Sequence, residues 1–95
     1  MGRFRRLRND NDDEYLKSER CTERICQRDD LNAFLILDRL LPGKQNIVSC
    51  AEHDIFYLDV DVERLEDVAT DEDILNLIRC GVLYESETES LFMFV

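Results

Sequence analysis

Carboxylates are the most abundant reactive side chains of this chain, and they are concentrated in its second half. The 95 residues include 22 Asp and Glu against 12 Lys and Arg, which gives a formal net charge of −10. Residues 1–44 carry ten basic and nine acidic side chains, whereas residues 45–95 carry two basic and thirteen acidic ones. Such a field repels nucleic acid and anionic membranes and attracts basic surfaces. We therefore expect a basic protein surface as the partner, with no direct binding of nucleic acid or membrane.

Two interpretations of these acids follow. If they share one face, they imitate the phosphate spacing of DNA and dock on the basic groove of a nucleic-acid-handling protein. Alternatively, they only keep a small protein soluble and complement its helix dipoles. The candidate partner-binding residues are Asp59, Asp61, Glu63, Asp71, Glu72, Glu85 and Glu87.

The spacing Asp59-x-Asp61-x-Glu63 matches the first ligands of a calcium loop. In such a loop the sixth position needs glycine and the twelfth a bidentate glutamate, but here they are Arg64 and Thr70. The sequence therefore excludes an EF-hand. We interpret Asp59 and Asp61 as the solvated face of a strand instead.

Four thiols and one imidazole are the remaining ligands with metal-binding chemistry. Cys21-x4-Cys26 and Cys50-x2-His53 form two pairs that suit a tetrahedral zinc site. Neither pair is a C-x2-C knuckle, and positions three apart on a strand face opposite sides of a sheet. The pattern favours free thiols in a reduced cytosol over a metal site, with zinc as the weaker alternative.

Motifs for catalysis are missing from the sequence. Its only histidine, His53, lies three residues from Cys50, and that spacing alone is no dyad. With three glycines in the chain, it has no phosphate-binding glycine loop, no nucleophile elbow and no HExxH. We expect a protein that is not an enzyme and needs no cofactor.

The best-specified element is a helix over residues 70–81. Thr70 is the expected N-cap, Asp73 completes a capping box, and Gly81 allows a left-handed exit. An apolar helix is expected over residues 31–41, capped by Asp29 and Asp30 and ended by Pro42-Gly43, with Asn32, Asp38 and Arg39 as its polar side. The other expected elements are a surface helix over 13–28, a helical turn over 62–69, and strands over 47–52, 55–60, 82–84 and 90–95.

Together these elements predict one small α+β domain over residues 13–95, preceded by a flexible arm over residues 1–12. Its fold is a four-stranded, mostly antiparallel sheet with two to three helices on one face, in the order α-α-β-β-α-β-β. The arm carries four arginines, and we interpret it as a solvated tail that folds back on the acidic body, in preference to a binding arm. A rival function is a structural domain in which an edge strand bearing Phe92 and Phe94 pairs with a second copy.

Three stretches of the second half carry a resemblance. They are Ala51-Glu52-His53-Asp54 through Asp59-Val60-Asp61, then residues 70–84, and finally Leu91-Phe92-Met93-Phe94-Val95. This pattern resembles small acidic proteins encoded by bacteriophages and prophages, and it covers about half of the chain. The resemblance assigns no functional residues. It implies a phage accessory protein in the bacterial cytoplasm that inhibits a host nuclease, restriction enzyme or CRISPR complex. An export signal and a membrane-spanning run of about 20 apolar residues are also missing from the sequence.

Overall fold

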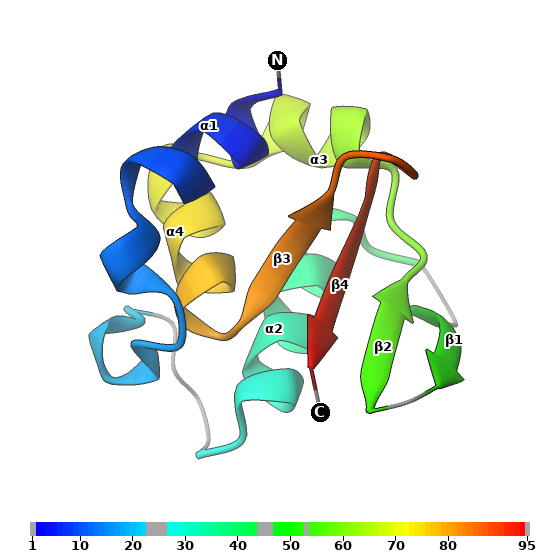
Figure 1. Ribbon diagram of the computed structural model, residues 1–95, viewed down its shortest axis with the longest axis horizontal. Coiled ribbons are helices and arrows are strands. Elements are labelled where there is room, and N and C mark those ends of the chain that lie inside the picture. Colours follow the sequence, from blue (N-terminus) through cyan, green and yellow to red (C-terminus); the bar gives the residue numbers. More distant parts are fainter. Residues whose placement is uncertain (1, 23–26, 44–46, 53, 95) are drawn as a thin grey trace.

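The computed structural model describes residues 2–22, 27–43, 47–52 and 54–94 (Figure 1). In these ranges the chain forms four α-helices, two 3-10 turns and four strands. They are α1 (Arg3–Asp10), η1 (Asp12–Glu14), η2 (Ser18–Arg20), α2 (Asp29–Leu40), β1 (Val48–Glu52), β2 (Ile55–Leu58), α3 (Val62–Val68), α4 (Asp71–Arg79), β3 (Val82–Glu85) and β4 (Ser90–Phe94). The predicted α+β class is confirmed. The predicted order and the predicted two to three helices are only partly matched. Among the described elements the order is α-α-β-β-α-α-β-β, in which the first helix is α1 and not the predicted helix over 13–28, and the expected turn over 62–69 is a helix, α3.

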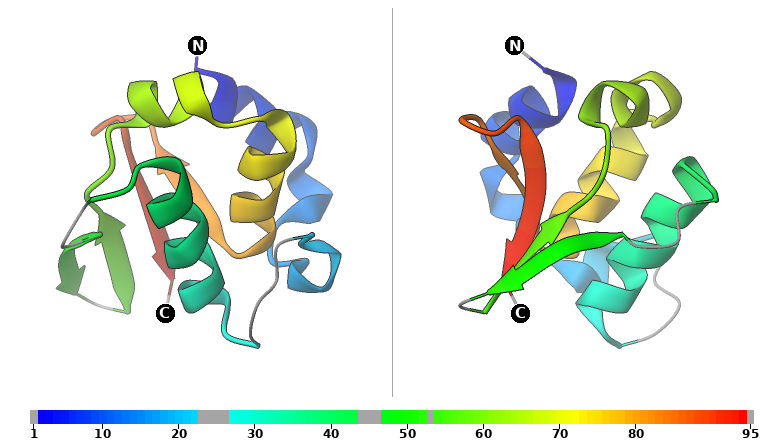
Figure 2. Two further views of the ribbon diagram at one scale, coloured as in Figure 1. Left: turned by 180° about the vertical axis from the view of Figure 1, so that it is seen from behind. Right: turned by 90° about the vertical axis from the view of Figure 1, so that its right-hand side faces the viewer.

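The strands form one antiparallel sheet in the order β1-β2-β4-β3. Side chains alternate between the two faces of a strand, and directly opposed residues share a face. Phe56 is opposite Met93, and Leu58 is opposite Leu91. These residues face α2 and α4, which lie on the same side of the sheet (Figures 1 and 2). The core therefore sits between this face and the helices.

The last strand, β4, lies inside the sheet and hydrogen-bonds to β2 and β3. The predicted edge strand bearing Phe92 and Phe94 is therefore wrong, because neither side of β4 is left to pair with a second copy. Pairing between strands distant in the chain depends on the whole sheet, and the local pattern of β4 does not specify it.

Helix α4 has the ends that the sequence predicts. Thr70 Oγ1 accepts from the Asp73 N–H at 3.1 Å, and Asp73 Oδ2 accepts from the Thr70 N–H at 2.9 Å. Gly81 follows with φ of +97°, and a Cβ at this position would lie 2.9 Å from Cδ2 of Leu16. Both the capping box and the glycine exit are confirmed.

Helix α2 is the expected apolar helix, but it is rotated relative to the prediction. Ala33, Ile36 and Leu37 are buried, and the ring of Phe34 lies 6.2 Å from that of Phe56. Asn32, predicted on the polar side, is fully buried, and Leu35 is exposed. The N-cap is Arg28, without a side-chain capping bond, so the cap predicted at Asp29 and Asp30 is wrong.

The N-terminus differs most from the prediction. Instead of a flexible arm, residues 3–10 form α1, which packs against α4 and β3. Phe4 is completely buried in the core, and Leu7 packs against it from the same helix face. Up to residue 22, where the described part of this segment ends, the predicted helix over 13–28 is replaced by η1 and η2, with Leu16 between them at φ of 61°. The chain does fold back on the acidic body, but as an ordered helix.

None of the described helices is long and apolar enough to cross a membrane.

Candidate functional site

Three of the candidate acids lie at the connection between β2 and α3. Strand β2 ends at Leu58, and the Asp59 N–H then donates to the carbonyl of Ile47 at 2.6 Å. Asp61 is the N-cap of α3, where its carboxylate accepts from the Arg64 N–H at 3.3 Å. An aspartate is favoured there because it satisfies a free N–H and complements the helix dipole. The interpretation of Asp59 and Asp61 as a strand face is therefore wrong, although both side chains are exposed.

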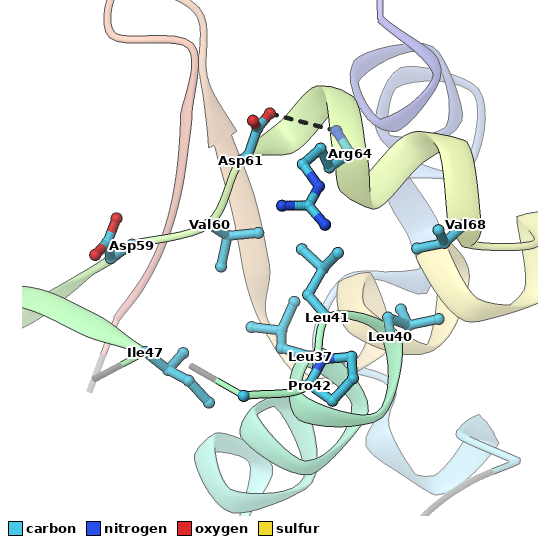
Figure 3. A pocket seen from close by; sticks show the side chains of 11 residues that line it. Leu37, Leu40, Leu41, Pro42, Ile47, Asp59, Val60, Asp61, Arg64 and Val68 are labelled. Carbon is cyan, nitrogen blue, oxygen red and sulfur yellow. Dashed lines mark hydrogen bonds between the residues drawn. The ribbon is translucent and has the colours of Figure 1, made fainter. Parts of the chain in front are cut away.

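A pocket of about 370 Å³ opens between this connection, α2 and α3 (Figure 3). Its floor is apolar and includes Leu37, Leu41 and Val60, while Asp59 and Asp61 lie at its margin. Figure 3 shows the guanidinium of Arg64 directed across the opening between Val60 and Leu41. The full lining is Leu37, Leu40, Leu41, Pro42, Gly43, Ile47, Asp59, Val60, Asp61, Arg64 and Val68.

A second pocket, of about 350 Å³, joins the start of α3 to the β3–β4 hairpin. Four carboxylates line it, and they come from three separate parts of the chain: Asp61 before α3, Glu63 and Glu66 within α3, and Glu89 in the hairpin. Val60 and Asp61 line both pockets, so the two form one continuous surface. We call Asp59, Asp61, Glu63 and Glu89 the acidic cluster.

Glu66 is not included in the cluster because, unlike the four members, it is only partly exposed, and its carboxylate anchors α1. It accepts from the N–H of Phe4, in the first turn of α1. A carboxylate at a helix N-terminus satisfies a free donor and the positive end of the dipole. A Cβ on Gly2 would lie 3.0 Å from the same carboxylate, so the close approach of the chain here depends on glycine. Glu66 therefore holds α1 in place.

The candidates on α4 are placed elsewhere and are already paired. Asp71 accepts from Arg3 at 3.0 Å, and Glu72 accepts from Arg79 at 2.8 Å. Neither residue lines the described pockets. Their charge is offset by these arginines, so they contribute less than the acidic cluster to attracting a basic partner.

Glu85 and Glu87 belong to the β3–β4 hairpin that carries Glu89. The N–H of Glu87 donates to Oε1 of Glu85 at 3.3 Å, which helps to shape the turn. The described lining of the two pockets includes Glu89 and neither of these two. They extend the negative charge along the hairpin, next to the cluster.

Of the four residues of the predicted zinc alternative, only Cys21 has a described side chain. Cys21 and Cys80 are both buried, with their sulfur atoms 4.0 Å apart. Cys26 and His53 lie outside the described residues, as does the side chain of Cys50. Within the described part of the chain, no group of three or more metal-binding side chains occurs.

Several residues of this region are not predicted from the sequence. Arg64 and Tyr84 line the pockets, and Glu66 and Arg3 hold α1 against α3. The spacing of Phe4 and Leu7, three apart as on one helix face, is the local signal that indicates an ordered α1.

The chain was compared with known proteins at three levels. No protein-family model, curated protein or solved structure matches it. The resemblance to phage proteins therefore stays a prediction.

Proposed function

We propose that the protein is a non-enzymatic binding module that docks its acidic cluster on a basic surface of another protein. The observation that carries this proposal is the continuity of the two pockets through Val60 and Asp61. The second pocket has the exposed carboxylates of Asp61, Glu63 and Glu89 around it, and the residues that it shares with the first pocket connect it to Asp59.

The contrast with the other acids supports a role beyond solubility. Glu14, Glu66, Asp71, Glu72 and Asp73 all accept hydrogen bonds from arginines or backbone N–H groups and thereby stabilise the fold. Among the described residues, the side chains of Glu63 and Glu89 accept no such bond, whereas Asp61 accepts the Arg64 N–H as the cap of α3. Like charges held together repel one another, and a basic partner relieves that repulsion.

The partner that fits this chemistry is a protein with a basic groove, the kind of surface that nucleic-acid-handling proteins present to phosphates. The setting we propose is the one that the phage resemblance implies, namely inhibition of a host nuclease, restriction enzyme or CRISPR complex in bacterial cytoplasm. The acidic cluster would then occupy the site of the nucleic acid and compete with it.

Affinity capture from bacterial lysate tests the proposal with three baits. One is the wild-type chain, and the second carries Asp59→Asn, Asp61→Asn, Glu63→Gln and Glu89→Gln, in which asparagine preserves the cap of α3. The third is a control of equal net charge with four exposed acids neutralised in the segment before α2: Asp10→Asn, Asp12→Asn, Asp13→Asn and Glu19→Gln.

The proposal predicts that a basic nucleic-acid-binding protein is retained at low salt by the wild type and the control and is lost from the cluster variant. Equal retention by all three baits, or equal loss from both variants, would show that the cluster is not the docking site.

A further inference from the structure

The face of the sheet opposite the helices is apolar. Alternation along the strands places Ile55 and Tyr57 of β2, Leu83 of β3, and Phe92 and Phe94 of β4 on it. We call these five side chains the open sheet face. They are neighbours across the strands: Phe92 lies between Tyr57 and Leu83, and Phe94 is opposite Ile55. None of the five belongs to the buried core or to the side chains that pack against it.

No described helix covers this face. Figure 2 shows α2 and α4 on the other side of the sheet, and α1 reaches only the β3 margin. Phe94 is 56% exposed, and its ring meets that of Phe92 edge to face, with centroids 5.7 Å apart. The other four side chains are half-buried beside it, so the open sheet face is a contiguous, partly exposed apolar surface, a feature that interaction sites share.

The charge around this face indicates which kind of partner can bind it. Every strand of the sheet belongs to residues 45–95, which carry thirteen acidic and two basic side chains. Glu85 lies on the open side of β3, beyond Leu83 and opposite Ser90, at the hairpin end. The face therefore combines aromatic rings with nearby carboxylates. A second copy carries the same net charge of −10, and a nucleic acid carries phosphates, so both are repelled.

We infer that the open sheet face binds an arginine-bearing segment of a basic partner protein. An arginine guanidinium stacks on aromatic rings and at the same time pairs with a carboxylate, whereas the compact ammonium of lysine is more strongly hydrated and stacks less well. The rings of Tyr57, Phe92 and Phe94 supply the stacking surface, and Glu85 supplies the carboxylate. This inference rests on the proposed function, since it identifies what the partner places beside the acidic cluster.

Two synthetic probes test it with the full-length protein. One is a capped peptide of alternating arginine and valine, and the other replaces every arginine with lysine, so the two peptides have the same charge. NMR titration follows the ring resonances of Tyr57, Phe92 and Phe94 together with the amides of the acidic cluster. The arginine peptide is expected to shift the ring resonances and to bind about fivefold more tightly than the lysine peptide, the ratio that one cation–π contact of about 1 kcal/mol gives.

Two variants show whether the preference for the arginine peptide depends on the open sheet face. Phe94→Ser removes one of the three rings and should lower the preference for arginine, while Leu35→Ser removes a similarly exposed apolar side chain on α2 and should leave the preference intact. Sedimentation of the free protein shows whether it is a monomer.

Shifts confined to Asp59, Asp61, Glu63 and Glu89, with equal affinity for both peptides, would overturn the inference and leave the proposed function standing. Binding of neither peptide would contradict both proposals. A dimer that Phe94→Ser dissociates would make a second copy the occupant and would also overturn the inference.

Discussion

Nε of Arg3 lies 3.0 Å from Oδ1 of Asp71, and the same guanidinium donates to the backbone carbonyls of Glu66 and Ala69. These carbonyls belong to the C-terminal end of α3, where backbone acceptors lack helical partners and the dipole is negative. Arg3 thus caps the C-terminal end of α3 and pairs with the first residue of α4. Both contacts hold the start of α1 in place. An arginine from the predicted arm is a structural residue.

Arg3→Ala should therefore destabilise the protein by about 2 kcal/mol, since it removes charge-assisted hydrogen bonds to partly buried acceptors. Urea unfolding followed by circular dichroism measures the change in the free energy of unfolding. Arg5→Ala, on the exposed side of the same helix, is the matched control and should change it by less than about 0.5 kcal/mol. Equal effects of the two substitutions would show that Arg3 does not hold α1.

Acid should destabilise the fold through Glu14 and Asp73. The hydrogen bond from Arg79 is the main cause that holds the pKa of Glu14 below its ordinary value. Burial alone raises the pKa of Asp73, but hydrogen bonds from Thr70 and Arg39 outweigh it, so the net pKa is lowered. A carboxyl whose pKa is lower in the folded state contributes stability above its ordinary pKa and loses it as the pH falls through the folded value.

The free energy of unfolding should accordingly stay level near neutrality and fall below about pH 4. Asp73→Asn should cost about 1 kcal/mol at neutral pH, because the capping box and the contact with Arg39 weaken, and should flatten the acid limb. Asp67→Asn, an exposed acid on α3, should leave the curve unchanged. If the free energy of unfolding of Asp73→Asn fell with pH as steeply as that of the wild type below about pH 4, this account would be contradicted.

Oxidation should join Cys21 to Cys80. Their sulfur atoms are 4.0 Å apart, so a small movement brings them to the roughly 2 Å of a disulfide. Oxidised glutathione as oxidant would accept the two electrons of the thiols and leave as two reduced glutathiones. The bond closes a loop of 59 positions, for which chain entropy gives up to about 4 kcal/mol of stabilisation, less any strain.

The measurement uses a Cys26→Ser, Cys50→Ser background, in which mass spectrometry should find a loss of two hydrogen atoms and calorimetry a higher Tm. Adding Cys21→Ser should remove both effects. A mixed disulfide with glutathione as the only product would show that the two thiols do not approach each other.

Glu89 has a backbone conformation that suits glycine better than glutamate. Its φ is +51°, in the left-handed region where a Cβ is disfavoured by about 1 kcal/mol or more. Glu89→Gly should therefore raise the free energy of unfolding by about 0.5–1 kcal/mol, while removing one carboxylate of the acidic cluster and weakening capture of a basic partner. Thermal unfolding and capture measured on the same preparation check the two effects. A less stable variant would mean that the glutamate side chain stabilises the hairpin.

Local features of the fold follow from the sequence, and the distant contacts do not. The capping box of Thr70 and Asp73 is predictable because both partners lie within one turn of a helix. The burial of Phe4 and the bond from its N–H to Glu66 join positions 62 apart, and no periodicity in residues 1–12 specifies that contact. For the same reason, β4 could be predicted as a strand but not as an inner one.

The candidate site divides in the same way. Asp59, Asp61 and Glu63 are neighbours in the sequence, so they stay together in the fold. The hairpin contributes Glu89 only because β4 pairs with both β2 and β3, and this places the hairpin turn beside α3 (Figure 1). Asp71 and Glu72 have the right charge for a partner, but Arg3 and Arg79 approach them from elements that sequence spacing does not relate to them.

The most direct test of the central claim is the salt dependence of the affinity for the captured partner. Calorimetric titration from about 50 to about 200 mM NaCl gives the slope of log Kd against log salt for the wild type, the cluster variant and the charge-matched control. Docking through the acidic cluster predicts a steep slope for the wild type and the control. The variant with Asp59, Asp61, Glu63 and Glu89 neutralised should bind more weakly and with a shallow slope. The same slope and affinity in both variants would show that only net charge matters, and the claim would be wrong.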